Sequence, residues 1–219
     1  MTKTTHMLAA TALTAALAAP SFAETWDMPL AYPATNFHSE AAAGFATCVG
    51  EATGGEIEIV THPNGSLFSG GDIKRAVQTG QALIGERLLS AHANENALFG
   101  YDSVPFLATS FDASVKLAEA AKPALSELLE SQNLVHLYSV PWPPQGLYAP
   151  KEIATVEDLK GLKFRAYNAA TARLAELAGM QPVQIEAAEL SQALATGVAE
   201  AFVSSGSTGY DEKVWEHLS

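Results

Sequence analysis

The chain has 219 residues, of which 48% are hydrophobic, and this is enough for one large domain or two small lobes with buried cores. Lysine and arginine total 12 against 24 aspartate and glutamate residues, which gives a net charge of −12. This composition excludes a disordered chain, and the absence of a basic run argues against a nucleic-acid partner.

The first 23 residues have the composition of a secretory signal peptide. Lys3 provides a positive start, residues 7–20 are rich in alanine and leucine, and small residues end at Ala23. A transmembrane anchor is the alternative, but the apolar stretch is shorter than the roughly 20 residues that a span needs. We therefore predict a signal peptide at residues 1–23 that is removed after Ala23, and a periplasmic mature protein.

The first part of the mature chain alternates short β-rich runs with amphipathic runs. We expect strands at residues 25–32, 56–63 and 82–87, helices at 37–50 and 70–81, two helices within 110–132, and two further strands within 133–150. Pro123 is expected to break the helical region. A proline-rich corner at residues 141–144 separates the last two strands and is our candidate boundary between two lobes.

Beyond this corner the same alternation continues. We expect a helical turn at 156–161, strands at 163–167, 181–185 and 199–205, and helices at 169–179 and 187–197. Strands that alternate with helices predict an α/β architecture with mostly parallel sheets.

Arg165 and Asn168 are the first candidates for a binding site. Arg165 ends a predicted strand, and in open α/β sheets ligands bind beyond the carboxyl ends of the strands. A guanidinium can bind a carboxylate through two parallel hydrogen bonds, and Asn168 lies where a helix N-terminus would favour the same anion. The alternative is structural, because arginines often pair with an internal acid and asparagine is a common N-cap.

Residues 156–201 resemble the most characteristic segment of the extracytoplasmic solute receptors of tripartite ATP-independent periplasmic (TRAP) transporters, of the DctP type. The family pattern is matched, in order, by Asp158, Leu159, Lys160, Gly161, Arg165, Gly179, Pro182, Glu189, Ala193, Leu194, Thr196 and Gly197. A weaker likeness begins at about Thr25.

The resemblance implies a two-lobed periplasmic-binding-protein-like fold with a hinge, in which lobe I covers residues 24–144 and lobe II covers 145–219. It implies a receptor, not an enzyme, that closes on an organic carboxylate and delivers it to the membrane subunits of the transporter. Arg165 would grip the carboxylate and Asn168 would line the same pocket. Because relatives usually continue well beyond the position of Ser219, we expect the chain to be incomplete at its C-terminus.

Three positions depart from the family pattern. Gln145 stands where sialic-acid-binding relatives have a second arginine, Ser204 where an asparagine is common, and Ala187 where an aromatic residue often stacks on the ligand. These changes favour a less polar ligand with a flat ring. We expect an aromatic monocarboxylate first, and a hydroxy or keto acid second.

Aromatic side chains could provide the walls for such a ring. We favour Trp142 and include Phe37, whereas ordinary packing is the stronger interpretation for Tyr32 and Tyr148. Glu86 and Arg87 end the strand predicted at 82–87, and adjacent strand residues point to opposite faces. We choose Glu86 to contact the ligand and expect Arg87 only to form a surface ion pair.

Other chemistry finds little support. The six histidines include no closely spaced ligand pair, so we expect no metal and no cofactor. Cys48 is the only cysteine, and its neighbours indicate a buried residue on a helix.

An exported hydrolase that uses the hydroxyls of residues 204–207 is the competing functional class, although the G-x-S-x-G motif is missing. A sensor input domain of the same fold is a third possibility, and we expect a monomer.

Overall fold

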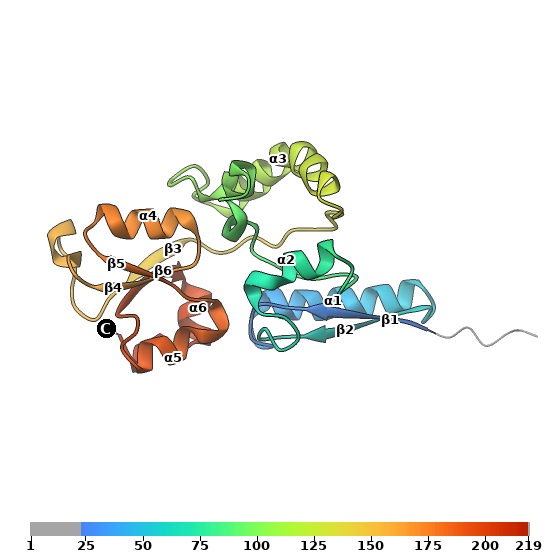
Figure 1. Ribbon diagram of the computed structural model, residues 1–219, viewed down its shortest axis with the longest axis horizontal. Helices are drawn as coiled ribbons and strands as arrows, with labels where there is room; N and C mark the ends of the chain where they lie inside the picture. The colour runs from blue at the N-terminus through green and yellow to red at the C-terminus, as the bar shows by residue number, and fades with distance from the viewer. Residues whose placement is uncertain (1–22, 219) are drawn as a thin grey trace, which may run out of the picture.

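The computed structural model describes residues 23–218, which form two sheets far apart in the chain (Figure 1). We refer to residues 23–144 as the N-terminal part and to residues 145–218 as the C-terminal part. The elements of the N-terminal part are β1 (Glu24–Pro29), α1 (Phe37–Ala52), β2 (Ile57–His62), α2 (Gly70–Gln78), η1 (Leu89–His92), η2 (Ala97–Ser103) and α3 (Phe111–Ser131).

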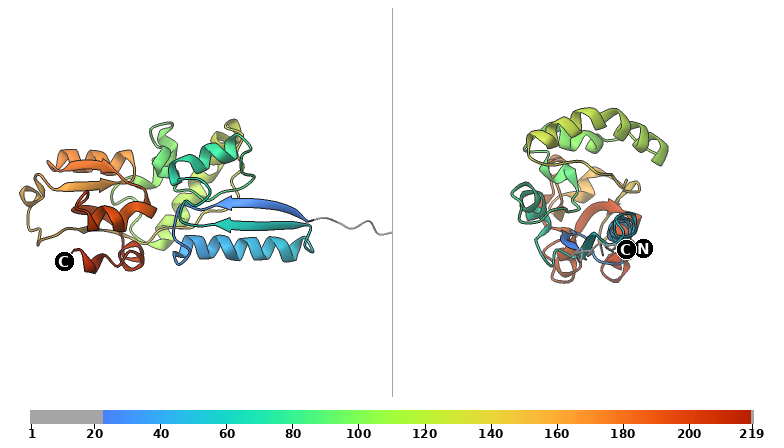
Figure 2. Two further views of the ribbon diagram at one scale, coloured as in Figure 1. Left: turned by 60° about the horizontal axis from the view of Figure 1, so that its bottom comes forward. Right: turned by 90° about the vertical axis from the view of Figure 1, so that its right-hand side faces the viewer.

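In the N-terminal part, β1 and β2 are parallel and α1 covers one face of the pair (Figure 2). The core between them contains Met28, Ile59 and Ala42. Asn36 caps α1, because its Oδ1 accepts a hydrogen bond from the backbone N–H of His38 (3.0 Å). Capping and apolar burial together account for the β1–α1–β2 unit, which the sequence predicted.

The strand predicted at residues 82–87 does not form. Only one bridge, between Leu30 and Glu86, joins this segment to β1. The segment is apolar enough to pack, since Ala82 and Ile84 are buried, but the chain leaves the sheet before a ladder develops. The strand predicted in the first half of 133–150 is also missing, because no strand of the described chain offers it a ladder.

Two further predictions for the N-terminal part are wrong. Residues 111–131 form one continuous helix, α3, with Pro123 in its interior. Proline removes a single backbone donor there, and the alanine, leucine and glutamate residues around it are good helix formers that continue the helix. Cys48 lies on α1 as expected but is exposed. Adjacent helical residues point about 100° apart, so Cys48 lies off the stripe that includes Phe45 and Val49.

The C-terminal part is a four-stranded sheet in the order β3-β6-β4-β5. Its elements are β3 (Gln145–Tyr148), η3 (Val156–Leu159), β4 (Lys163–Ala166), α4 (Ala169–Leu177), β5 (Gln181–Gln184), η4 (Ala187–Glu189), α5 (Leu190–Ala195), β6 (Ala201–Ser205), α6 (Gly206–Asp211) and η5 (Val214–Glu216). The pairs β4·β5 and β4·β6 are parallel, whereas β3·β6 is antiparallel. The predicted α/β architecture with mostly parallel sheets is confirmed.

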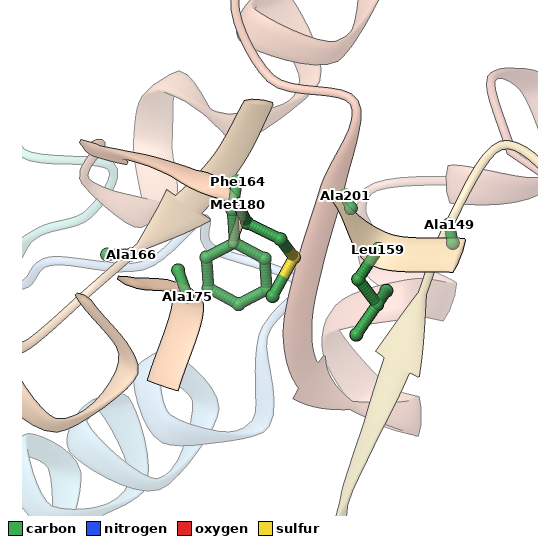
Figure 3. Packing of buried hydrophobic residues seen from close by; sticks show 7 residues of the cluster. All are labelled: Ala149, Leu159, Phe164, Ala166, Ala175, Met180 and Ala201. Carbon is green, nitrogen blue, oxygen red and sulfur yellow. The ribbon is translucent and has the colours of Figure 1, made fainter. Parts of the chain in front are cut away.

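Two apolar clusters hold this sheet on opposite faces. Phe164 is completely buried with Met180 and Ala175 on the side of α4 (Figure 3). Phe202 is completely buried with Leu190 on the side of α5. Because successive strand residues alternate between faces, Ala201 and Phe202 fix β6 from both sides, whereas Phe164 and Ala166 bury one face of β4.

The predicted signal peptide lies almost entirely outside the described residues, so its removal remains a prediction. Between residues 23 and 218, no helix combines the length and the apolar composition needed to cross a membrane.

Replacing Phe164 by alanine should lower the free energy of unfolding by about 3–5 kcal/mol, since a fully buried ring leaves a cavity. Denaturant titration of purified protein measures this change. Leu177→Ala is the control, because this α4 side chain is 70% exposed and its loss should change stability by less than about 0.5 kcal/mol. Equal losses in both variants would contradict the packing described here.

Candidate functional site

Arg165 is a buried arginine whose head group has no acidic partner. It lies near the carboxyl end of β4 and is 5% exposed. Its Nε–H donates a hydrogen bond to the backbone carbonyl of Ile185 (2.9 Å), and its guanidinium carbon lies 5.1 Å from the centre of the Tyr167 ring. Within the described chain, no carboxylate oxygen lies within 4.0 Å of the guanidinium, and its Nη atoms have no hydrogen-bond partner.

The electrostatic state of Arg165 follows from this burial. Desolvation lowers the pKa of the guanidinium, while nearby acidic groups, including Tyr32 and Glu186, act in the opposite direction. A pKa that begins as high as that of arginine still leaves the side chain charged at neutral pH. The site therefore presents a positive charge with unused donors, which is a suitable partner for an anion.

Asn168 begins α4, as the sequence predicted. Its Oδ1 accepts a hydrogen bond from the backbone N–H of Thr171 (2.8 Å), which caps the helix. Its Nδ2 donates to the hydroxyl of Ser90 (3.0 Å), which belongs to the N-terminal part. Both polar atoms of the Asn168 side chain therefore have protein partners, and the residue joins the two parts of the chain.

The N-terminal part contains an aromatic cluster. We use this name for Tyr32, Phe37, His38 and Trp142. The His38 and Trp142 ring centres are 4.2 Å apart, those of Phe37 and Trp142 are 5.0 Å apart, and those of Tyr32 and Trp142 are 5.0 Å apart. Ala187, from the C-terminal part, packs against the buried group that contains Tyr32. Two of the predicted site residues, Phe37 and Trp142, are thus in contact, and Ala187 lies against the group that includes Tyr32 of the same cluster.

Tyr32 is buried in an apolar cluster of the N-terminal part. Burial raises the pKa of its hydroxyl, and the charges of Glu86, Arg87, Arg165 and Glu186 also act on this pKa. These four charged residues are connected along the chain and through hydrogen bonds: Glu86 precedes Arg87, Arg87 binds Glu186, and the carbonyl of the residue before Glu186 accepts the hydrogen bond of Arg165 Nε. Within the described residues the Tyr32 hydroxyl forms no hydrogen bond. The sequence favoured ordinary packing for Tyr32, and its contacts with the His38 and Trp142 rings agree with that interpretation.

Glu86 is a second buried polar group without a full set of partners. Its side chain is 15% exposed, its Oε2 is buried without a hydrogen-bond partner, and its Oε1 lies 3.8 Å from His38 Nδ1. Burial raises the pKa of Glu86 to about 7, although the backbone N–H of Ala31 and the charge of Arg87 lower it. Burial also lowers the pKa of His38 to about 4, so this imidazole is neutral at physiological pH.

Arg87 does more than form a surface ion pair. Its guanidinium binds the Glu186 carboxylate with two hydrogen bonds, Nη1 to Oε2 (2.8 Å) and Nη2 to Oε1 (3.0 Å). The Arg87 side chain is only 9% exposed, and its partner belongs to the C-terminal part. A Cβ atom at Gly70, the first residue of α2, would come within 2.5 Å of Glu186 Oε2. The ion pair therefore fills the space at the start of α2 and connects the two parts.

Gln145 and Ser204 lie on the neighbouring strands β3 and β6. Gln145 is exposed, and its Oε1 accepts a hydrogen bond from the Tyr167 hydroxyl (3.4 Å), so it connects with Arg165 only through the Tyr167 ring. Ser204 is buried, and its backbone faces Gly146. Tyr148 stacks on Phe202 in the core, with ring centres 4.6 Å apart, in agreement with the structural interpretation.

The hydroxyl-rich residues 204–207 form the junction between β6 and α6. The Ser205 hydroxyl accepts from the backbone N–H of Thr208 and caps the helix. In the described region no histidine is hydrogen-bonded to a hydroxyl of this segment, and no group of three side chains with metal-binding chemistry occurs.

Sequence reasoning missed the Arg87–Glu186 pair and the contacts of His38 with the aromatic rings. The strand-end rule that selected Arg165 also pointed to Arg87, but the strict alternation of a strand was applied to a segment that forms a single bridge. Nothing in the sequence indicates that Glu186 meets Arg87, because 99 positions separate them.

The family model for bacterial extracellular solute-binding proteins of family 7 (DctP) matches residues 30–218. The chain belongs to this family.

Solved structures of relatives agree with this assignment. A TRAP solute-binding protein from a marine metagenome, specific for pyroglutamate, is 64% identical, with a TM-score of 0.89. Two extracytoplasmic solute receptors of Bordetella pertussis that bind pyroglutamic acid are 51% and 43% identical, with TM-scores of 0.86 and 0.87. These matches cover 89–90% of this chain, which spans 65% of the length of each relative.

The Arg87–Glu186 pair should contribute to the stability of the folded chain. In a double-mutant cycle with Arg87→Met and Glu186→Gln, we expect a coupling energy of about 1–3 kcal/mol, because one partner is buried and the other is partly exposed. The Arg173–Glu176 pair is the control, since both side chains are more than half exposed and should couple by less than about 0.5 kcal/mol. Denaturant titrations give both values, and a coupling for Arg87–Glu186 as small as that of the control would contradict its role.

Proposed function

We propose that this chain is the solute-binding receptor of a TRAP transporter and that it binds pyroglutamate. In this proposal the N-terminal part, residues 24–144, and the C-terminal part, residues 145–219, are the two lobes of the receptor. The ligand is bound between them in the periplasm and is then delivered, chemically unchanged, to the membrane subunits of the transporter.

The observation that carries the proposal is the state of Arg165. A buried guanidinium without a counter-ion is unfavourable, and an anion that accepts two hydrogen bonds from the Nη atoms would relieve this cost. The Nε–H is already bonded to the Ile185 carbonyl, so the fork is held in one orientation. A single carboxylate fits the two free Nη donors of this buried guanidinium.

The surrounding groups support a small ring. The aromatic cluster and Ala187 provide apolar contacts, while Tyr32 and Glu86 offer polar atoms beside them. Such a combination of apolar walls and few polar groups is typical of sites for small organic ligands. In this proposal Gln145 and Ser204 line the outer part of the same site, and Asn168 joins the lobes around it.

The choice of pyroglutamate rests on the relatives, three of which bind it at identities between 43% and 64%. Pyroglutamate has one carboxylate and a nearly flat five-membered ring, which agrees with the expected monocarboxylate and flat ring. It is not aromatic. Aromatic monocarboxylates, and then hydroxy or keto acids, are the alternatives that the departures at Gln145 and Ala187 suggested.

Calorimetric titration of the full chain with these acids tests the ligand. We expect pyroglutamate to bind more tightly than any aromatic, hydroxy or keto acid in the panel, and to raise the melting temperature, because a ligand that binds only the folded state stabilises it. If an aromatic acid binds more tightly than pyroglutamate, the choice of pyroglutamate is wrong and the aromatic acid is the better ligand.

Replacing Arg165 by alanine should weaken pyroglutamate binding by about 10²–10⁴-fold, because two charge-assisted hydrogen bonds of about 1.5–3 kcal/mol each are lost. Arg173→Ala is the matched control, since this arginine is exposed on α4 and should leave affinity unchanged. The melting temperature of the Arg165 variant without ligand reports on folding. Unchanged affinity in a folded Arg165→Ala variant would refute the proposed site.

A further inference from the structure

Glu86 is a buried carboxyl group that the binding of a carboxylate by Arg165 does not explain. Its Oε2 is buried and lacks a hydrogen-bond partner, and its nearest basic group, His38 Nδ1, lies 3.8 Å from Oε1, beyond hydrogen-bond distance. A buried polar group without a partner costs free energy, so such groups in native structures usually have a role. Here the group directly precedes Arg87, which binds Glu186, and Glu186 follows Ile185, whose carbonyl binds Arg165 Nε.

The charges around Tyr32 can be counted. Arg87 and Glu186 neutralise each other through two hydrogen bonds. Arg165 would be neutralised by the carboxylate of a bound ligand. An ionised Glu86 would then be a buried negative charge with no cation of its own, whereas a protonated Glu86 leaves the site electrically balanced.

A protonated carboxyl group has one donor, the O–H, and one acceptor, the carbonyl oxygen, on the same edge. A lactam presents the complementary edge, because its ring holds the amide in the cis form with N–H and C=O side by side. These two edges can form a pair of parallel hydrogen bonds. An aromatic or purely aliphatic acid has no such edge.

We propose that Glu86, as a neutral carboxylic acid, forms hydrogen bonds with the ring amide of a lactam carboxylate. This interaction would determine which small monocarboxylates the protein prefers. This inference rests on the proposed function, since it assumes that Arg165 binds the ligand carboxylate. The N-terminal part would then bind the ring amide of the ligand through Glu86. The C-terminal part would bind the carboxylate of the ligand through Arg165.

The protonation states of the neighbours agree with this assignment. The pKa of Glu86 is raised to about 7 by burial, so the proton is retained through mildly acidic pH. His38 on α1 has a pKa of about 4 and does not titrate near neutrality. Burial raises the pKa values of Tyr32 and Tyr138, so both hydroxyls are neutral near pH 7, and Arg87 is hydrogen-bonded to Glu186. Among Glu86, His38, Tyr32 and Tyr138, Glu86 is thus the group that changes charge near pH 7.

The first experiment compares pyroglutamate with its lactone analogue, 5-oxotetrahydrofuran-2-carboxylate, in which a ring oxygen replaces the N–H. Calorimetry on the full chain should give at least about 30-fold tighter binding of pyroglutamate, because the lactone leaves the Glu86 acceptor unpaired. In Glu86→Leu, pyroglutamate should lose this advantage while the affinity of the lactone changes by less than about 5-fold. Glu119→Leu on α3, where the glutamate is exposed, is the control and should behave as the wild type.

The second experiment uses Glu86→Gln, because an amide side chain has both a donor and an acceptor and cannot titrate. We expect this variant to bind pyroglutamate within about 5-fold of the wild type. Wild-type affinity should fall as the pH rises from about 6 to about 8.5, since Glu86 loses its proton in that window, and the Gln variant should show no such fall.

The outcomes separate the two proposals. If the wild type binds pyroglutamate and the lactone equally, or binds pyroglutamate more tightly as the pH rises, the role of Glu86 is overturned and the receptor function stands. If the wild type does not bind pyroglutamate at all, the proposed ligand fails, and the assignment of Glu86 fails with it. Melting curves without ligand confirm that each variant is folded.

Discussion

A guanidinium that leaves water without a counter-ion loses several kcal/mol of hydration, and the position of Arg165 imposes this cost on the fold. β4 cannot move to expose the charge, because Phe164, the residue before Arg165, is completely buried beneath α4. The Ile185 carbonyl fixes one edge of the guanidinium, and the other edge has no protein acceptor. Among the described residues the fold therefore maintains a localised positive charge whose Nη donors remain free for an anion.

The Arg87–Glu186 pair shows a guanidinium that has a carboxylate partner, which Arg165 lacks between residues 23 and 218. There, both hydrogen bonds of the guanidinium fork are made to a carboxylate of the protein, and the pair joins the two parts of the chain. Asn168 with Ser90, and Asn36 Nδ2 with Asp211 Oδ2 (2.7 Å), are further polar contacts between the parts. The described contacts between the parts thus include paired polar groups, whereas the Nη atoms of Arg165 and Oε2 of Glu86 lack a hydrogen-bond partner in the described chain.

Local sequence signals were reliable at the strand-to-helix junction of the C-terminal part, where neighbours in space are also neighbours in sequence. The strand β4, the helix α4 and the N-cap Asn168 between them were predicted. They follow one another directly in the sequence, and the cap acts on the helix that it begins. The same reasoning failed at residues 82–87 and within 133–150, where an apolar extended segment becomes a strand only if another strand pairs with it. It also failed at Pro123, where the surrounding helix formers outweighed one missing hydrogen bond.

The sequence by itself determined the α/β class, the family, and the arginine and asparagine at the strand-to-helix junction, since periodicity, caps and a motif of local spacing encode them. Tertiary structure alone decided that the rings of the aromatic cluster come together, that Glu86 is buried near His38, and that Arg87 binds Glu186 across 99 positions. The physical reason is that burial and Coulomb interactions depend on distances in space. Those distances exist only after the two parts of the chain have folded and come into contact.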